Sequence, residues 1–379
     1  ETARRMQADN LADVVRPASK SRVSYPTKLY TGDRRRQATT PDEVQDVCVG
    51  HFKRLFSKEP VAEAAGQRLL DEWIVPEIRP EIRRYLSRPV TAGCLLKAMP
   101  SSGSFSAPGP DGLPWDFYRC FKNRVCTLLH KIMRHSLRCG QLPRGMSDSV
   151  VRLIPKDGKD PTAISAWRPI ALLNCDFKLL SHWANARLQG YLVRVIHPDQ
   201  AGFMPGRRIH DHIITMRALA AQEEGAILLT DDDAAYNRVS RDWLLRVAGR
   251  VVDDQLLSTI SMLTESSSTR LLLHRLSPAI ATERGVPQGL PLSPSLYNLA
   301  CEPLLGALRQ AQLQGLRAPL GDRVRVQAYA DDKALFLAYP SDLEVVKDIF
   351  ARYEAASGAR INPAKSTLVV LDGSPLGRW

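Results

Sequence analysis

The first half of the chain carries apolar residues at helical spacing. Thr40, Pro41 and Glu43 combine a capping residue, a proline suited to the first turn and the acid of a capping box, so a helix should begin there. Apolar residues then recur three or four positions apart as far as Phe56, which predicts that one face of this helix is buried. The same spacing predicts further helical tracts over 61–73, from 115 onward and over 176–195.

Short apolar runs predict strands, and two of them lead to acidic residues. The run 149–155 is typical of a strand. The run 226–230 ends at the aspartates 231–233, as a buried strand does when it carries carboxylates at its exposed end. Residues 324–338 alternate around a turn, which predicts a β-hairpin with the aspartates 331–332 at its tip. Irregular alternation of strands and helices without an internal repeat favours an α+β fold.

Three local signals place helix ends in the second half of the chain. Ser293 followed by Pro294 is typical of a cap and a first helical turn. Ser341 and Glu344 predict another capping box, and Gly358 stands where a left-handed helix terminus is expected. Two helices should therefore flank the acidic hairpin.

Composition narrows the class of protein. The 379 residues include 52 Lys and Arg against 40 Asp and Glu, a formal net charge of +12, and 44% are hydrophobic. These values exclude disordered, collagen-like and coiled-coil proteins, and the positive balance favours a polyanionic partner such as nucleic acid. No apolar run approaches the roughly 18–20 residues of a membrane-spanning helix, so no membrane partner is expected.

Cysteines and the start of the chain bear on the compartment. The seven cysteines are scattered without a C-x-x-C pair, which predicts neither a disulfide framework nor a zinc site and favours a reducing compartment. The chain begins at Glu1 without a signal segment, so we expect a piece of a longer protein that carries no address.

The aspartates at the two predicted strand ends are candidate metal ligands. Asp231 and the pair Asp331 and Asp332 are expected to converge on divalent cations, because carboxylate oxygens suit Mg²⁺. The alternative is that they are solvated turn residues, since Asp is common in turns. The apolar residues 227–229 and 335–337 favour the first interpretation, because buried strands form a rigid platform for a site.

These residues belong to motifs that resemble those of reverse transcriptases, in the family's order. The motifs are W-R-P-I at 167–170, D-x-x-x-A-Y at 231–236, R-G-V-P-Q-G-L-P-L-S-P at 284–294 and Y-A-D-D at 329–332. Further strings resemble non-LTR retrotransposon enzymes of the long-interspersed-element type, namely A-P-G-P-D-G at 107–112, L-I-P-K at 153–156, H-P-D-Q-A-G-F at 197–203 and S-G-A-R-I-N-P-A-K-S at 357–366. The resemblance covers most of the chain.

The resemblance implies a right-hand polymerase with fingers and a palm, whose antiparallel palm sheet packs on helices. The thumb is expected to be absent. Four regions are expected. Residues 1–39 are a basic arm that includes Arg34, Arg35 and Arg36, and residues 40–100 are a helical extension. A fingers-like region follows over 101–215, and the palm occupies 216–379. The implied partners are an RNA template, a DNA primer and dNTPs, within a nuclear or cytoplasmic ribonucleoprotein.

The resemblance also implies catalytic residues. Asp231, Asp331 and Asp332 would hold two Mg²⁺ ions, for which Mn²⁺ can substitute, in a two-metal nucleotidyl transfer. Lys365 would match the tail lysine that protonates the leaving pyrophosphate. From the residues alone, a solvated loop lysine is nearly as good an interpretation of Lys365.

Further residues would contact the incoming nucleotide. Tyr236 would lie under its sugar and exclude a 2′-hydroxyl, which argues against an RNA-synthesising polymerase. Lys156 and Arg168 would hold the triphosphate. Gln288 and Gly289 would pack under the nascent base pair, where glycine permits close approach. From the residues alone, Tyr236 also fits a core tyrosine, Lys156 and Arg168 fit surface cations, and Gln288 and Gly289 fit a turn before a helix.

Lys333 departs from the family pattern, because an apolar residue is usual after the second aspartate. This cation is expected either to compete with Mg²⁺ or to pair with Asp232. With the missing thumb, it motivates an alternative function, a catalytically impaired nucleic-acid-binding remnant. An intron-type reverse transcriptase is a second alternative.

Overall fold

The computed structural model describes residues 25–31, 36–101, 107–222, 224–265, 267–318, 321–375 and 379. Most of the expected basic arm, with Arg34 and Arg35, lies outside the described residues. The chain divides into two compact units, each assembled from three segments. The first unit runs to Lys58 and adds 88–186 and 258–293, and the second comprises 59–87, 187–257 and 294–379.

The first unit contains helices and a four-stranded sheet. Its helices are α2 (Pro41–Phe56), α5 (Ala92–Ala98), α6 (Trp115–Cys120), α7 (Lys122–Cys139) and the start of α8 (Cys175–Val195), with a short 3-10 turn at Ile164–Ala166. Its strands are β1 (Leu29–Tyr30), β2 (Gln37–Ala38), β3 (Ser149–Pro155), β4 (Trp167–Leu173), β6 (Ser267–Leu272) and β7 (Ile280–Thr282). The larger sheet has the order β4-β3-β6-β7, in which β3 and β6 are parallel and the other pairs antiparallel.

Local sequence signals account for α2 and β3. Thr40 accepts a hydrogen bond from the Glu43 amide while the Glu43 carboxylate reaches back to the cap, so the predicted capping box is confirmed. Cys48, Phe52 and Phe56 are buried along one face, as the spacing predicts. Strand β3 has the predicted bounds, and its partner β4 returns from the turn that follows it.

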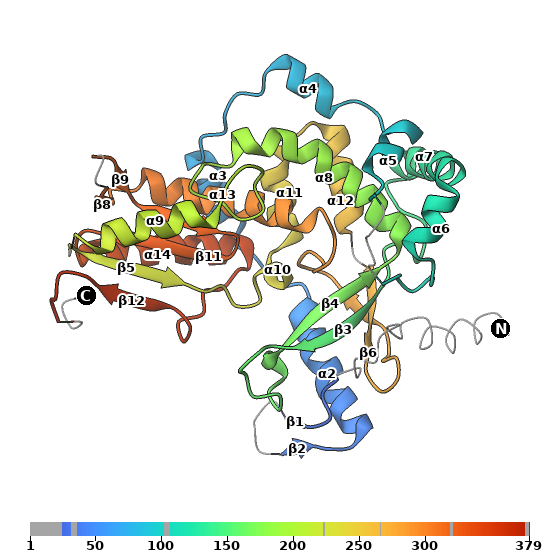
Figure 1. Ribbon diagram of the computed structural model, residues 1–379, viewed down its shortest axis with the longest axis horizontal. Coiled ribbons are helices and arrows are strands. Elements are labelled where there is room, and N and C mark those ends of the chain that lie inside the picture. Colours follow the sequence, from blue (N-terminus) through green and yellow to red (C-terminus); the bar gives the residue numbers. More distant parts are fainter. Residues whose placement is uncertain are drawn as a thin grey trace. The chain divides into compact units, whose positions relative to one another are not determined.

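The second unit combines helices with a fully antiparallel sheet (Figure 1). Its helices are α3 (Glu63–Glu72), α4 (Pro80–Leu86), α9 (Ile209–Ala220), α10 (Ala235–Arg238), α11 (Arg241–Gly249), α13 (Ser293–Gln310) and α14 (Ser341–Ser357), and α12 (Asp254–Thr264) begins in it. Its strands are β5 (Ala226–Thr230), β8 (Leu316–Arg317), β9 (Arg323–Val324), β10 (Val326–Tyr329), β11 (Asp332–Leu337) and β12 (Thr367–Val370). The sheet has the order β10-β11-β5-β12, and the predicted hairpin is its β10-β11 pair.

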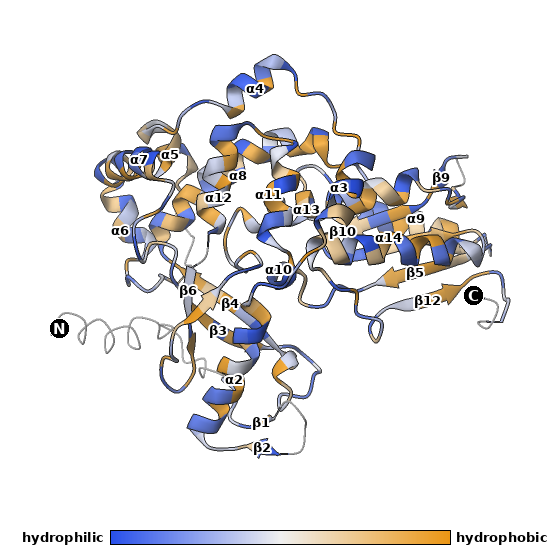
Figure 2. Ribbon diagram, turned by 180° about the vertical axis from the view of Figure 1, so that it is seen from behind, coloured by the Kyte–Doolittle hydropathy of each residue, from blue (hydrophilic) through white to orange (hydrophobic). Residues whose placement is uncertain are grey.

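One face of this sheet packs against α9. Figure 2 shows apolar residues along β5, the strand between β11 and β12. Ile227 of β5 and Phe336 of β11 are buried together with Leu219 of α9, and Met216 packs against them. At about 25 cal/mol per Å² of apolar surface, burial of such large side chains stabilises this layer. The expected mixture of helices with antiparallel sheets is confirmed.

The start of α14 differs from the prediction. Ser341 is the first helical residue and Pro340 is the cap, so the predicted capping box of Ser341 with Glu344 is wrong. The Asp342 carboxylate instead accepts hydrogen bonds from the amides of Ala338 and Tyr339, at 3.0 and 3.3 Å. The helix ends as predicted, since Gly358 follows it with a φ of 71°.

A membrane-spanning helix needs about 20 consecutive, predominantly apolar residues. No helix within the described ranges is both long enough and apolar enough to cross a bilayer.

Candidate active site

The three candidate metal ligands meet at one end of the antiparallel sheet. Asp231 directly follows β5, and Asp332 is the first residue of β11. The register pairs Lys333 with Thr230, so the next positions along the two strands, Asp332 and Asp231, also lie opposite each other. Asp331 stands in the turn just before β11. The structure therefore places Asp231 and Asp332 at opposite positions at this end of the sheet, with Asp331 next to Asp332, although about a hundred residues separate Asp231 from the pair in the chain.

The strand period separates the acids from the lysine beside them. Successive strand side chains point to opposite faces, so Asp332 shares a face with Ala334 and Phe336, and Lys333 projects from the other face. Ala334 and Phe336 belong to the cluster beneath α9. Asp332 is exposed while Lys333 is 2% exposed. Asp332 and the unexpected lysine therefore project from opposite faces of the sheet.

Lys333 pairs with Asp232 inside the protein. Its Nζ lies 2.7 Å from Asp232 Oδ2, with side-chain exposures of 0% and 1%, and also donates to the Asp331 carbonyl at 3.0 Å. Tyr297 of α13 donates its hydroxyl to the same Oδ2 at 2.6 Å. Burial lowers the pKa of Lys333, but Asp232, Cys301 and Asp331 together outweigh burial and the net shift is upward. Of the two expectations for Lys333, pairing with Asp232 is the one that the structure contains.

Burial and neighbouring charge raise the pKa of two of the three acids, Asp331 and Asp332. Burial raises the pKa of Asp331 and the charge of Asp332 adds to it; burial likewise raises the pKa of Asp332, and the charge of Asp231 adds to it. Lys365 Nζ lies 2.7 Å from Asp231 Oδ2, both side chains being partly exposed. Within the described residues, no three His, Cys, Asp or Glu side chains are grouped closely enough to hold a metal ion. The carboxylate donors suit Mg²⁺, and the repulsion between them is what a bound cation relieves.

A pocket of about 350 Å³ opens beside these acids within the second unit. Asp231, Asp332 and Lys365 line one part of it, and Ile209 and Ile213 of α9 line another. Asp231 is fixed there from the tail of the chain, because its carbonyl accepts a hydrogen bond from the Asn362 amide at 2.8 Å. The pocket therefore combines an anionic part with an apolar wall.

Tyr236 is held by a second tyrosine. It lies in α10, just after the strand end that carries Asp231, and its ring stacks on Tyr297 with centroids 4.6 Å apart and planes 22° apart. Among the described residues its buried hydroxyl has no hydrogen-bond partner. Burial, followed by the charge of Asp331, raises the pKa of this hydroxyl. Tyr297 thus contacts both Tyr236 and the Asp232 that follows the first catalytic candidate.

Lys156 and Arg168 lie in the first unit, on the β3-β4 hairpin. Arg168 is exposed on β4 and pairs in register with Ile154. The Lys156 amide donates to the Ala166 carbonyl, and its Nζ donates to the Ser165 carbonyl at 2.8 Å. Both cations therefore belong to one short hairpin, although they stand twelve positions apart.

Gln288 and Gly289 pack against the same strand in the first unit. The Gln288 carbonyl accepts a hydrogen bond from the Ala171 amide at 2.9 Å. Gly289 has a φ of 117°, and a Cβ there would lie 2.8 Å from the Ala171 carbonyl oxygen. Both the conformation and the close approach require glycine. The four nucleotide-binding candidates of the first unit are thus all attached to β4 or its hairpin.

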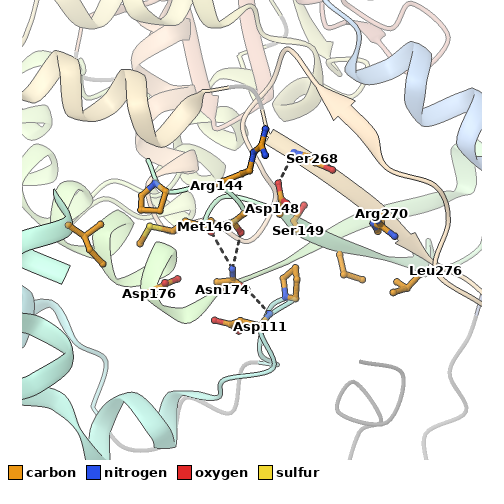
Figure 3. Close-up of a pocket in the computed structure, with 15 residues that line it drawn as sticks. Asp111, Arg144, Met146, Asp148, Ser149, Asn174, Asp176, Ser268, Arg270 and Leu276 are labelled. Atoms are coloured by element: carbon orange, nitrogen blue, oxygen red, sulfur yellow. Dashed lines mark hydrogen bonds between the residues drawn. The ribbon is translucent and has the colours of Figure 1, made fainter. Parts of the chain in front are cut away.

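A further pocket, with a volume of about 640 Å³, lies in the first unit (Figure 3). Its polar side chains bond mainly within the unit: the Asn174 Oδ1 accepts from the Asp111 amide, and Asp148 accepts from the Ser268 amide, each at 3.1 Å. Burial raises the pKa of Asp176 to about 6, with a smaller contribution from Asp111. This pocket contains none of the predicted site residues.

A match to a family profile shows the family to which the chain belongs. The profile of the reverse transcriptase (RNA-dependent DNA polymerase) family matches residues 154–377, more than half of the chain. The chain belongs to the reverse transcriptase family. The matched region contains all the predicted site residues, from Lys156 to Lys365, and the family expected from the motifs is confirmed.

The relatives of this reverse transcriptase are proteins of mobile elements. It is 33% identical over 342 residues to an uncharacterized 149 kDa protein of transposon TX1 from Xenopus laevis, which covers 88% of this chain and 26% of that protein. It is 28% identical to a Pol polyprotein from retrotransposable element R2 of Popillia japonica, over 71% of this chain and 38% of the relative. It is 27% identical to the RNA-directed DNA polymerase from mobile element jockey of Drosophila melanogaster, over 68% of this chain and 29% of the relative. The non-LTR assignment is thereby supported, and the chain spans about a quarter to two-fifths of each relative's length.

The candidate site is surrounded by residues that sequence reasoning did not single out. Three of them are buried near the acids or their backbone, namely Gln200, Tyr297 and Asn298. Tyr297, for example, donates its hydroxyl to Asp232. Their signal in the sequence was weak. Gln200 lies within H-P-D-Q-A-G-F, a string that served only as part of the resemblance. Tyr297 and Asn298 lie on the helix predicted from Ser293 and Pro294, and that prediction gave them no role in a site.

Proposed function

We propose that this chain catalyses RNA-directed DNA synthesis. In this reaction the 3′-hydroxyl of a DNA primer attacks the α-phosphate of a dNTP that is paired with an RNA template, and pyrophosphate leaves. The placement of Asp231 opposite Asp332, at the end of an antiparallel sheet, is the observation that carries the proposal. In this assignment the sheet of the second unit is the palm, and β3 and β4 belong to the fingers.

Asp231 and Asp331 would hold two Mg²⁺ ions, with Asp332 beside them, and Mn²⁺ would be accepted as a substitute. Burial together with neighbouring charge raises the pKa of Asp331 and of Asp332, which fits a site that is completed by cations. When bound, the ions would favour ionisation of the primer hydroxyl and neutralise charge on the triphosphate.

Other residues would bind and orient the nucleotide. Lys156 and Arg168 would contact the triphosphate, and the backbone at 288–289 would lie under the nascent base pair. Tyr236 would exclude a 2′-hydroxyl with its ring. Lys365 would give a proton from Nζ to the leaving pyrophosphate, and its 2.7 Å contact with Asp231 supports its placement beside the acids.

The two alternatives make different predictions. The alternative of a non-catalytic nucleic-acid-binding remnant rested partly on Lys333. Because Lys333 is buried against Asp232, it no longer supports that alternative. An intron-type reverse transcriptase is less well supported, because the relatives named above come from transposable elements. A remnant would bind an RNA template with its primer and incorporate nothing.

The test is Mg²⁺-dependent extension of a DNA primer on an RNA template by this chain and by the variant D331N/D332N. We expect dNTP incorporation by the chain and a loss of at least about a thousandfold in the variant, because both substitutions remove anionic ligands. Binding of the primer–template by both proteins shows that the variant is folded. Binding by both without incorporation by either would overturn the proposed activity.

A further inference from the structure

A loop of the second unit, residues 197–207, holds the turn of the catalytic hairpin. The Ala328 amide of β10 donates to the Asp199 carbonyl at 2.7 Å, and the Ala201 amide donates to the Ala328 carbonyl at 2.9 Å. A bridge between Gln200 and Ala328 joins the two segments as neighbouring strands. The loop therefore extends to the place where β10 turns toward Asp331.

The turn contains a residue in an unfavourable backbone conformation. Ala330 has a φ of 57° and is 3% exposed. The left-handed region is sterically unfavourable for a residue with a Cβ, so other contacts must maintain it. Asp331 follows Ala330 directly, and the direction of its side chain depends on the backbone of Ala330.

Gln200 satisfies both backbone groups of Ala330. Its Oε1 accepts the Ala330 amide at 2.8 Å, and its Nε2 donates to the Ala330 carbonyl at 3.2 Å. The same Oε1 accepts the Gly202 amide at 2.9 Å. Gln200 is 0% exposed, so these groups would be left unpaired away from water without it.

Neighbouring residues fix Gln200 and the loop. A Cβ on Gly202 would lie 2.2 Å from the Ala330 nitrogen, so only glycine permits this approach. Asn298 of α13 donates to the Gly202 carbonyl at 2.6 Å. The Arg207 guanidinium donates to the Gln200 carbonyl at 2.7 Å and to the Ile196 carbonyl at 2.7 Å. The loop that carries Gln200 is thus itself held by α13 and by Arg207.

We propose that Gln200 is a positioning residue for the polymerase reaction, which fixes the carboxylate of Asp331 by clamping the backbone of Ala330. This inference rests on the proposed function of Asp331 as a metal ligand. Gln200 touches neither substrate nor metal in this role. Its loss should reduce turnover and cation affinity while nucleic-acid affinity is maintained.

The test compares the chain with its Q200M variant, because Met preserves the volume of Gln and removes its hydrogen bonds. We expect kcat for dNTP incorporation to fall by about 10²-fold, as for misplacement of a catalytic group. The Kd for an RNA–DNA primer–template should change less than about twofold. The affinity for Mn²⁺, followed by the electron paramagnetic resonance of the free ion with primer–template present, should fall severalfold.

Two further variants separate positioning from a general loss of stability. W243F removes a buried hydrogen bond to the Ala300 carbonyl elsewhere in the same unit, and should lower the Tm with little effect on kcat or Mn²⁺ affinity. A330G in the Q200M background should restore part of kcat and of Mn²⁺ affinity, because glycine adopts the left-handed conformation without cost. Equal losses of kcat in Q200M and W243F at matched stability would overturn the proposal, and so would failure of A330G to restore either quantity.

Hydrogen exchange tests the clamp without activity. The Ala330 amide should exchange faster in Q200M than in the chain and in W243F, because it loses its acceptor. If the chain itself incorporates no dNTP, the proposed function fails, and the exchange and Mn²⁺ measurements still decide whether Gln200 positions the turn. Unchanged exchange and unchanged Mn²⁺ affinity in Q200M would exclude the clamp.

Discussion

The ring of Tyr236 is fixed by its stack on Tyr297, and its hydroxyl makes no hydrogen bond among the described residues. The ring itself should therefore exclude a 2′-hydroxyl. We expect Y236A to raise rNTP incorporation relative to dNTP incorporation by at least about tenfold, and Y236F to leave the ratio unchanged. Single-nucleotide insertion with each triphosphate measures the ratio. An unchanged ratio in Y236A would remove sugar selection from Tyr236.

Asp176, at the start of α8 in the first unit, should make stability depend on pH. Burial raises its folded pKa to about 6, above the ordinary value of 3.8 for an aspartate. The folded state therefore binds the proton more tightly, so this residue costs stability above pH 6 and the cost disappears as the pH falls toward 4. D176N cannot ionise and retains the oxygen that accepts from the Phe177 amide.

Urea denaturation of D176N and of the chain at pH 7.5 and pH 4.5 measures this effect. At pH 7.5 we expect D176N to be more stable by about 1–3 kcal/mol, and at pH 4.5 the difference should be much smaller. The comparison needs no other variant, because each protein serves as its own reference at the second pH. A difference of the same size at both values would contradict the ionisation of Asp176 as its cause.

Sequence reasoning found the residues that carry charge in recognisable motifs and missed those that support them. Asp231 and Asp332 follow or begin apolar runs, so local pattern placed them at strand ends. The sequence left open whether Lys333 competes with Mg²⁺ or pairs with Asp232, and the structure contains the buried pair. Gln200 could not be found in this way, since its two bonds to Ala330 depend on how a distant loop meets the hairpin.

At the scale of elements, the buried pair of Lys333 with Asp232 joins β11 to the end of β5. Removing one partner leaves a charge buried alone, which costs about 3–5 kcal/mol, whereas removing both charges costs less. We therefore expect K333M and D232N to destabilise the protein strongly when single, and K333M/D232N to destabilise it by less than their sum. Urea denaturation of the four proteins gives the coupling energy.

The exposed pair of Lys347 with Glu344 on α14 is the matched control, since its side chains are 60% and 75% exposed. K347M should cost less than about 1 kcal/mol. If K333M cost no more than K347M, the buried pair would have no role in holding the two strands together.

Elements defined by local signals were predicted with their bounds, and long-range pairing was not. Strand β3 and the cap of α2 depend on residues near in sequence, so pattern was sufficient. The capping box at Ser341 failed because Asp342 binds the preceding amides instead. The parallel pairing of β3 with β6 joins segments more than a hundred residues apart, and nothing in either segment specifies it.

At the scale of the whole molecule, each unit is assembled from three segments of the chain. The regions predicted from the sequence, 40–100, 101–215 and 216–379, divide the chain by position alone. They are functional regions, and they remain a prediction. The described part of the second unit contains the acids, Tyr236 and Lys365, and that of the first contains Lys156, Arg168, Gln288 and Gly289. The candidate site residues are therefore divided between the two units.

The net charge of +12 predicts how binding of the primer–template responds to salt. Lys and Arg that contact phosphates release condensed counterions, so affinity should fall by at least about tenfold between roughly 0.05 and 0.2 M NaCl. Fluorescence anisotropy with a labelled RNA–DNA primer–template measures this dependence. The D331N/D332N variant should show the same slope, because it loses no cation, and slightly tighter binding, because it loses two negative charges. A salt-independent Kd would mean that the basic excess lies away from the nucleic acid, whereas a steep slope in both proteins with extension by only one would separate binding from catalysis.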